Sequence, residues 1–204
     1  MLVRPAAQSS DHRGVVLQAL RRAVGITQKP AQLKRYGGGE YLGGVPAVER
    51  LLADLEAAKG NGVEEFQRLN PVKGDPFGGI HEELVHLRLL AERRRAAAAF
   101  LRKAGEVLPT VRPSLNAAAT EYAEVSRLTL EAFVLRHGPV EETDRISEIA
   151  RLGTYENNPE WDAYWQRAGA NLADPAKRKE LARLIAVALG HERAALAEIE
   201  QAIH

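Results

Sequence analysis

Residues 80–106 read IHEELVHLRLLAERRRAAAAFLRKAGE and contain no proline. Apolar side chains recur along this stretch at the three- and four-residue spacing of one helix face, as at Leu84, Leu87, Ala91 and Leu101. A helix of this length reaches on the order of 40 Å, because each residue adds about 1.5 Å. We therefore predict one long helix over residues 80–106, against which other helices pack.

Further amphipathic segments lie on both sides of this helix. Proline and glycine punctuate them, and Asn158-Pro159 and Asp174-Pro175 each combine an N-cap residue with a proline at the first helical position. The predicted helices cover residues 11–24, 46–58, 114–135, 141–152, a brief stretch from 159, and 175–203, with a short turn at 63–69. No stretch alternates in the manner of a strand. The sequence predicts an all-α fold, an antiparallel helical bundle of three to four long helices plus short accessory helices.

The composition excludes several classes of protein. The chain has no cysteine, so it can form no disulfide, no Cys-ligated metal site and no Cys nucleophile. Its 28 basic and 27 acidic residues give a net charge of +1, which argues against a dedicated nucleic-acid binder. No segment approaches the roughly 20 apolar residues of a membrane span, and no secretory signal is visible. We expect a cytoplasmic protein, with residues 1–10 as a linker-like tail and residues 11–204 as a single helical domain.

Four aromatic residues gather in a chain that is otherwise poor in them. Tyr155, Trp161, Tyr164 and Trp165 include both tryptophans of the chain. They could line a ligand pocket or dock on a partner. They could equally close the open end of the bundle, which is the commoner role of such clusters. We take these four residues as candidates for ligand or partner binding.

A glycine-rich loop supplies two further candidates. Residues 36–44 read YGGGEYLGG, without the Gly-Lys-Ser/Thr of a nucleotide-binding loop and without a preceding strand. The glycines permit positive φ in a long connection. A loop of this kind, carrying Tyr36 and Tyr41, could also cover a cleft.

One helical segment has the spacing of a metal site. His81 and His86 are five residues apart and cannot bind one ion from a straight helix, but Glu83-x-x-His86 has the spacing found in ferritin-like di-iron bundles. Such sites need more carboxylates, for which facing helices offer Glu121, Glu124 and Glu192. Charged residues on a helix surface are the simpler interpretation, and no cofactor is predicted.

Three consecutive arginines, Arg93, Arg94 and Arg95, lie in the middle of the longest helix. Consecutive residues project in different directions around a helix, so these three form no single phosphate site. We expect them on a solvated face.

Four segments resemble, in order and spacing, the helical C-terminal portion that follows a papain-like N-terminal domain in proteins related to butirosin biosynthesis protein H. Three of the segments are VVLQALRRAV at 15–24, GGVPAVERLLADL at 43–55 and RRRAAAAFLR at 93–102. The fourth covers residues 174–202 and contains ERAALAEIE at 192–200. The resemblance covers most of residues 12–203 and lies in amphipathic helices rather than in a catalytic motif.

The resemblance implies a helical half that works beside a papain-like domain, which in butirosin biosynthesis protein H transfers an acyl group from a carrier protein. No cysteine of such a domain has a counterpart here. We therefore expect a non-catalytic helical accessory domain that binds a ligand or a partner. The expected partners are a papain-like catalytic domain, a small molecule or a second copy of the chain. The alternative is a metal-dependent, ferritin-like bundle enzyme that uses Glu83 and His86.

Overall fold

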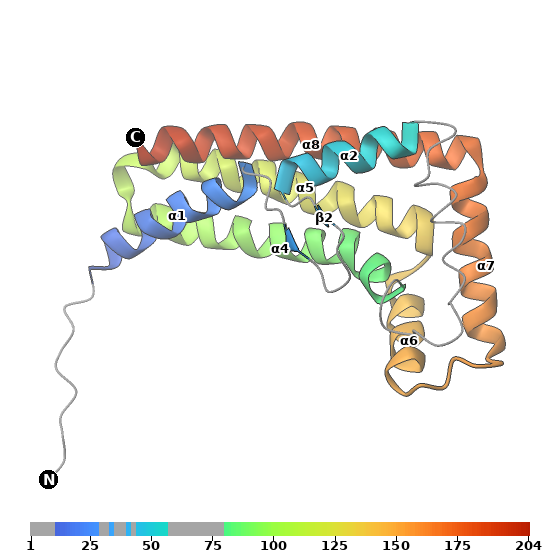
Figure 1. Cartoon of the computed structure of the whole chain (residues 1–204). Coiled ribbons are helices and arrows are strands. Elements are labelled where there is room, and N and C mark those ends of the chain that lie inside the picture. Colours follow the sequence, from blue (N-terminus) through green and yellow to red (C-terminus); the bar gives the residue numbers. More distant parts are fainter. Residues whose placement is uncertain (1–10, 29–32, 35–39, 42–43, 57–79) are drawn as a thin grey trace, which may run out of the picture.

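The structure is a computed structural model that describes residues 11–28, 33–34, 40–41, 44–56 and 80–204. Within these residues the fold is all-α, as the sequence predicts. Three long helices form the body of a bundle: α4 (Ile80–Val107), α5 (Arg112–His137) and α8 (Pro175–Ile203). Helix α5 contacts both of the others and runs in the opposite direction to them (Figure 1). A single 3-10 turn, η1 (Pro109–Val111), joins α4 to α5.

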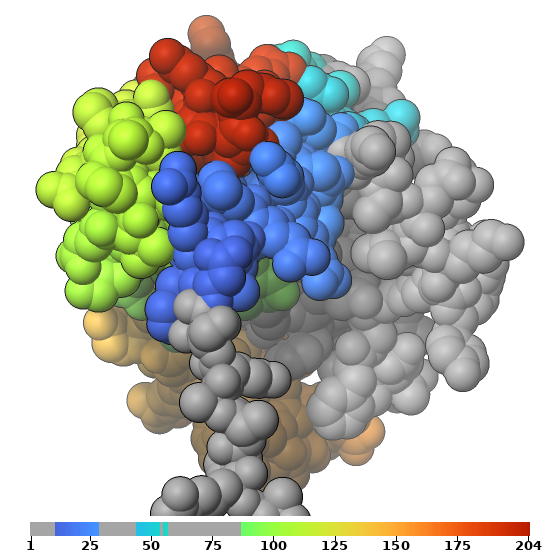
Figure 2. All heavy atoms as spheres, turned by 90° about the vertical axis from the view of Figure 1, so that its left-hand side faces the viewer, coloured from blue at the N-terminus to red at the C-terminus, as the bar shows by residue number. Residues whose placement is uncertain are grey.

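Two shorter helices add a fourth row to this bundle. Helix α1 (His12–Gln28) and helix α2 (Gly44–Glu56) lie one after the other along α8, and α1 also contacts α4 (Figure 1). Figure 2 shows the end at which α1 packs beside the last turns of α8 and the connection from α4 to α5. Each short helix contributes one apolar stripe to the main core, in which Leu20, Val24 and Leu55 are buried.

Polar caps begin several helices where the sequence predicts them. Asp11 accepts a hydrogen bond from the Gly14 N–H at 3.0 Å at the start of α1. Asn158 accepts from two backbone N–H groups, at 3.0 and 3.3 Å, and so caps α7 (Pro159–Ala173). Asp174 caps α8 in the same way, at 2.8 and 3.3 Å. These bonds satisfy N–H groups that have no partner inside the helix.

Two predictions about helix ends are wrong. Gly25 does not end the first helix, which continues to Gln28. A glycine inside a helix costs about 1 kcal/mol relative to alanine, and the burial of Val24 beside it offsets that cost. The helix that starts at Pro159 is not brief, because it extends for 15 residues and packs against both α5 and α8. The turn predicted at 63–69 lies outside the described residues.

A short antiparallel ladder is the one strand pairing among the described residues. It pairs β1 (Leu33–Lys34) with β2 (Glu40–Tyr41), with Leu33 opposite Tyr41. The prediction that the chain has no sheet is therefore wrong at this point, because two-residue strands are too short to produce an alternating pattern. None of the described helices combines the length and the apolar character needed to cross a membrane.

Helices α6 (Val140–Arg151) and α7 form a hairpin that projects from the bundle at the end of α5 (Figure 1). Gly138 separates α5 from α6 with φ 89°, a backbone conformation that glycine adopts without strain. The hairpin has a small core of its own, formed by Ile146 and Ala150 from α6 and by Trp161 and Tyr164 from α7.

Three consecutive residues of α8 pair with three different helices. Successive side chains on a helix point about 100° apart, so neighbours in the sequence reach different partners. The pairs are His191 with Glu121 of α5 (Nδ1–Oε2 2.6 Å), Glu192 with Arg94 of α4 (2.6 Å), and Arg193 with Glu49 of α2. Together they fix the position of α8 relative to its neighbours.

The pair formed by Arg94 and Glu192 lies inside the bundle. Nε of Arg94 donates to Oε2 of Glu192, and Nη2 lies 2.6 Å from Oε1, although only the first contact has hydrogen-bond geometry. Glu192 is 5% exposed, and the Arg94 guanidinium lies 5.0 Å from the centre of the Tyr122 ring. The expectation that Arg93–Arg95 form a solvated face is therefore wrong for Arg94. Of the three arginines, Arg94 is the one whose side chain faces α8.

Burial changes the ionisation of this cluster. It raises the pKa of Glu192 above its usual range despite the neighbouring guanidinium of Arg94. It also raises the pKa of Tyr122 to about 12, with a smaller contribution from the Glu192 carboxylate. Arg94 is thus the group that makes a charged Glu192 tolerable in the core.

We predict that Arg94→Met lowers the free energy of unfolding by about 3 kcal/mol, because it leaves a buried carboxylate without its cation. Arg94→Met combined with Glu192→Met should recover most of that loss. Urea denaturation measures both. Arg127→Met is the control, since Arg127 pairs with Glu124 and Glu131 in solvent and should cost about 1 kcal/mol or less. Equal losses for Arg94→Met and Arg127→Met would contradict this account.

Gly44 allows α2 to begin directly against the end of α1. Its φ is +64°, and a Cβ at this position would lie 2.2 Å from the carbonyl oxygen of Thr27. No side chain can occupy that space without moving the backbone. The approach of α2 to α1 therefore requires glycine here.

Gly44→Ala is expected to destabilise the chain by about 1–3 kcal/mol, through positive φ and the clash with Thr27. Gly190→Ala in α8 is the matched control. A Cβ at position 190 meets nothing within 4 Å, so this variant should gain up to about 1 kcal/mol from helix propensity. Thermal unfolding compares the two, and a neutral Gly44→Ala would show that the helices do not meet in this way.

Candidate functional site

The four aromatic residues identified in the sequence come together in the α6–α7 hairpin. Ring centres are 5.7 Å apart for Trp161 and Trp165, and 5.6 Å apart for Tyr155 and Trp161. Trp161 and Tyr164 are buried, whereas Tyr155 and Trp165 are half-buried at the edge of the cluster. The buried pair forms the core of the hairpin, and the other two extend that core toward the surface.

His137 joins this cluster from the end of α5. Its ring lies 4.9 Å from Phe133, 6.0 Å from Tyr164 and 6.4 Å from Trp165, measured between centres. The side chain is 1% exposed. Burial, together with the positive charges of Arg136 and Arg167, lowers the pKa of His137 from 6.5 to about 2. The imidazole is therefore neutral at physiological pH.

Several polar atoms of the cluster have no hydrogen-bond partner among the described residues. They are Nδ1 of His137, Nε1 of Trp161 and Nε1 of Trp165. In contrast, the hydroxyl groups of Tyr164 and Thr143 are hydrogen-bonded to each other at 3.2 Å. Each buried donor without a partner costs about 1–3 kcal/mol. The aromatic cluster is thus a hydrophobic core that contains polar nitrogen atoms without hydrogen-bond partners among the described residues.

The other predicted site residues lie outside what the structure describes. Tyr36 falls in an undescribed range, and the side chains of Tyr41, Glu83 and His86 are not described. The metal site at Glu83 and His86 therefore stays a prediction. Among the described residues, no three His, Asp or Glu side chains form a group that could hold a metal ion. The further carboxylates considered for it have basic partners, which are His191 for Glu121, Arg127 for Glu124 and Arg94 for Glu192.

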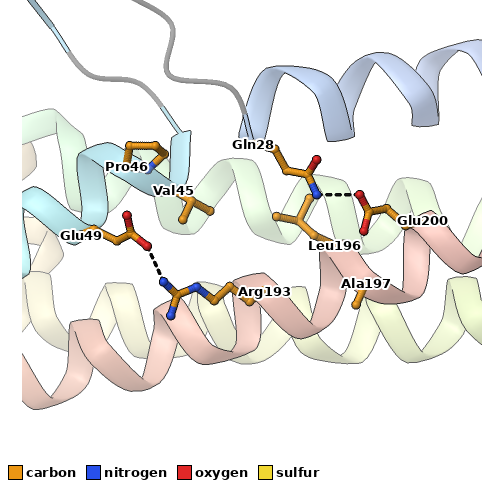
Figure 3. A pocket seen from close by; sticks show the side chains of 8 residues that line it. All are labelled: Gln28, Val45, Pro46, Glu49, Arg193, Leu196, Ala197 and Glu200. Carbon is orange, nitrogen blue, oxygen red and sulfur yellow. Dashed lines mark hydrogen bonds and ion pairs between the residues drawn. The ribbon is translucent and has the colours of Figure 1, made fainter.

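A hollow that the sequence did not reveal lies where α1 gives way to α2 along α8 (Figure 3). Its volume is about 390 Å³, near the lower end of the range for small-molecule sites. Eight of the described residues line it: Gln28 from α1, Val45, Pro46 and Glu49 from α2, and Arg193, Leu196, Ala197 and Glu200 from α8. The four residues from α8 share one face, because they follow the three- and four-residue spacing of a helix.

The hollow has an apolar middle and two polar ends. At one end the Arg193 guanidinium pairs with the Glu49 carboxylate, and at the other the Gln28 amide Nε2 donates to Glu200 Oε1 at 2.6 Å (Figure 3). Val45 and Leu196 lie between these pairs in the same view, while Pro46 lies near Glu49 and Ala197 near Glu200. Such a surface can hold the apolar body of a ligand and fix the orientation of its polar groups.

Sequence reasoning missed this hollow because no single segment contains it. Its lining residues look like ordinary surface positions of three amphipathic helices. The one local signal was Gly43-Gly44 before Pro46, which indicates a tight start of α2 but not which helix that start meets. The contacts of α1 and α2 with each other and with α8 place the end of α1 and the start of α2 on the same stretch of α8.

Comparisons with models of protein families, with curated proteins and with solved structures find no match to this chain. The resemblance to proteins related to butirosin biosynthesis protein H, and the papain-like partner that it implies, therefore stay predictions. Function has to be inferred from the chemistry of the site itself.

His137 should make the chain sensitive to acid. The unfolded chain binds a proton near pH 6.5 and the native state only near pH 2, so the stability from a neutral His137 is complete above pH 6.5 and declines as the pH falls toward 2. At pH 5 the loss is about 2 kcal/mol. We expect His137→Gln to show a smaller drop in melting temperature between pH 7.5 and 5 than the native chain.

The exposed His204 provides the control for this measurement. His204→Gln should keep the acid sensitivity of the native chain. If His137→Gln and the native chain lose the same number of degrees, His137 is not the group responsible.

Proposed function

We propose that this chain is a non-catalytic helical binding domain, which receives a small organic ligand in the hollow between α1, α2 and α8. The observation that carries the proposal is the hollow itself, with its volume of about 390 Å³ and its apolar middle between two polar pairs. The apolar part of a ligand that fits this volume can lie against the apolar middle of the hollow. Its polar groups then meet side chains that their partners already hold in place.

The chemistry of the lining supports binding rather than catalysis. The eight lining residues that the structure describes include no hydroxyl, imidazole or amine that could act as a nucleophile. The one guanidinium is paired with Glu49, and the remaining Glu200 accepts from an amide. These groups can orient a ligand, but they form no pair of nucleophile and base.

The rigid bundle supports the same role. Leu196, which lines the hollow, is also part of the main core and is 4% exposed. The hollow thus rests on packed side chains of α8. A preformed site loses less conformational entropy on binding than a site that must first be ordered.

The test uses a bulky side chain at Ala197, an exposed residue of the hollow. A mixed set of small amines, alcohols, carboxylates and aromatic compounds is screened by saturation-transfer NMR. We expect at least one compound to bind the native chain and to lose most of its signal with Ala197→Phe, because the ring fills the hollow. Stability should change by less than about 0.5 kcal/mol at this surface position.

Ala194→Phe is the matched control, since Ala194 is exposed on α8 but does not line the hollow. It should bind the same compounds as the native chain. The proposal fails if no compound of the set binds, or if Ala197→Phe binds them as well as the native chain does.

A further inference from the structure

We infer that the hollow selects a small aliphatic amine, whose ammonium group pairs with the carboxylate of Glu200. This inference rests on the proposed function and adds the chemical class of the ligand. Among the described residues, the charges that line the hollow do not balance.

Glu200 provides the unbalanced charge. At the far end of the hollow, Arg193 and Glu49 compensate each other. Glu200 accepts a hydrogen bond from the Gln28 amide at 2.6 Å, and no lysine or arginine of the described residues pairs with it. An amide donor is neutral and leaves the negative charge of the carboxylate in place. The described residues of the lining therefore carry one net negative charge.

The end of α1 increases the negative potential at the same place. Gln28 is the last residue of α1, and the last turn of that helix contains no basic side chain. The carbonyl groups at a helix C-terminus carry a partial negative charge, equivalent to about half an elementary charge. Because Gln28 contacts Glu200, this helix end lies beside the carboxylate. Both features favour a cation.

The apolar middle of the hollow limits the ligand to one charge. Arg193 and Glu200 are seven residues apart on α8, so the two polar ends lie about 10 Å apart along the helix. Val45 and Leu196 lie between them, and Pro46 and Ala197 complete the apolar part of the lining (Figure 3). A second charge on this strip would lose its hydration without finding a partner. A short alkyl chain with one terminal amine matches the surface.

Other ligand classes fit less well. A carboxylate or phosphate would need Arg193, whose guanidinium is already paired with Glu49, and would approach the negative charge of Glu200. A neutral alcohol can use the apolar strip and one hydrogen bond, but it gains nothing from the unbalanced charge. An ammonium group forms charge-assisted hydrogen bonds, which are about twice as strong as neutral ones.

The experiment compares n-pentylamine, 1-pentanol and pentanoate, which share one alkyl chain and differ in the polar group. Each is titrated into the full chain, with dissociation constants from ligand-observed NMR. We expect the amine to bind at least tenfold more tightly than the alcohol, which corresponds to about 1.4 kcal/mol. Pentanoate should not bind detectably.

Glu200→Gln tests the group assigned to the amine. This variant should weaken pentylamine at least tenfold, to the level of pentanol, and change pentanol less than twofold. Glu198→Gln is the matched control, because it removes the same charge two residues away on α8 from a side chain that does not line the hollow. It should leave the amine affinity within twofold of the native chain.

The possible outcomes separate this inference from the proposed function. Pentanol binding as tightly as pentylamine, or Glu200→Gln binding the amine undiminished, overturns the selectivity but leaves a ligand site in the hollow. If none of the three compounds binds and the wider screen is also empty, both ideas fail. A further titration uses lysine with its amino and carboxyl groups blocked. If this compound binds more tightly than pentylamine, the site takes a lysine side chain of another protein, and a free amine is the wrong ligand.

Discussion

The contact between Arg94 and Glu192 constrains the relative position of the long helices more than any apolar contact around it. An alanine- and leucine-rich interface can slide by one helical turn and still bury similar surface. A buried carboxylate that moves away from its guanidinium loses several kcal/mol. The two neighbouring residues of α8 hold two other helices at the same height along the bundle. His191 pairs with Glu121 of α5, and Arg193 pairs with Glu49 of α2. One stretch of three residues thus sets the register of α8 against three helices, and such specificity is the best-attested use of buried polar pairs.

The hollow follows from this register. The pair of Arg193 and Glu49 holds α2 against α8, and Gly44 of α2 lies against Thr27 of α1. The end of α1 therefore lies beside Glu200, seven residues further along α8 than Arg193. The fourth row of the bundle is therefore interrupted where α8 presents a face of mixed apolar and charged residues. A continuous fourth helix would cover that face with its own side chains. Among the described residues, the break between α1 and α2 leaves it partly open, and this opening is the ligand site that we propose.

Much of the fold could be predicted from the sequence, because helix periodicity and capping are local properties. The inward face of α5 is an example: Leu115, Ala119 and Phe133 follow the spacing of one helix face in the sequence, and all three are fully buried. Arg94 could not be predicted, since three consecutive arginines give no indication of which one faces a carboxylate 98 positions away. His137 was missed because the predicted helix ended at Leu135, and its burial depends on the α6–α7 hairpin folding back over it. The hollow depends on three helices at once and has no signal in any of them.

The two candidate regions differ in what a ligand would have to do there. In the aromatic cluster, Trp161 and Tyr164 already fill the space between α6, α7 and the end of α5, so a ligand would first have to displace packed rings. That displacement costs about as much as the burial of an aromatic side chain contributes, of the order of 3 kcal/mol. A ligand would recover part of this free energy only if it brought a hydrogen-bond acceptor to the N–H groups of Trp161 and Trp165. In the hollow, the apolar strip and Glu200 can be approached without moving a core residue. The binding that we propose there starts from a surface that the fold has already formed, and for this reason we place the ligand site in the hollow rather than in the aromatic cluster.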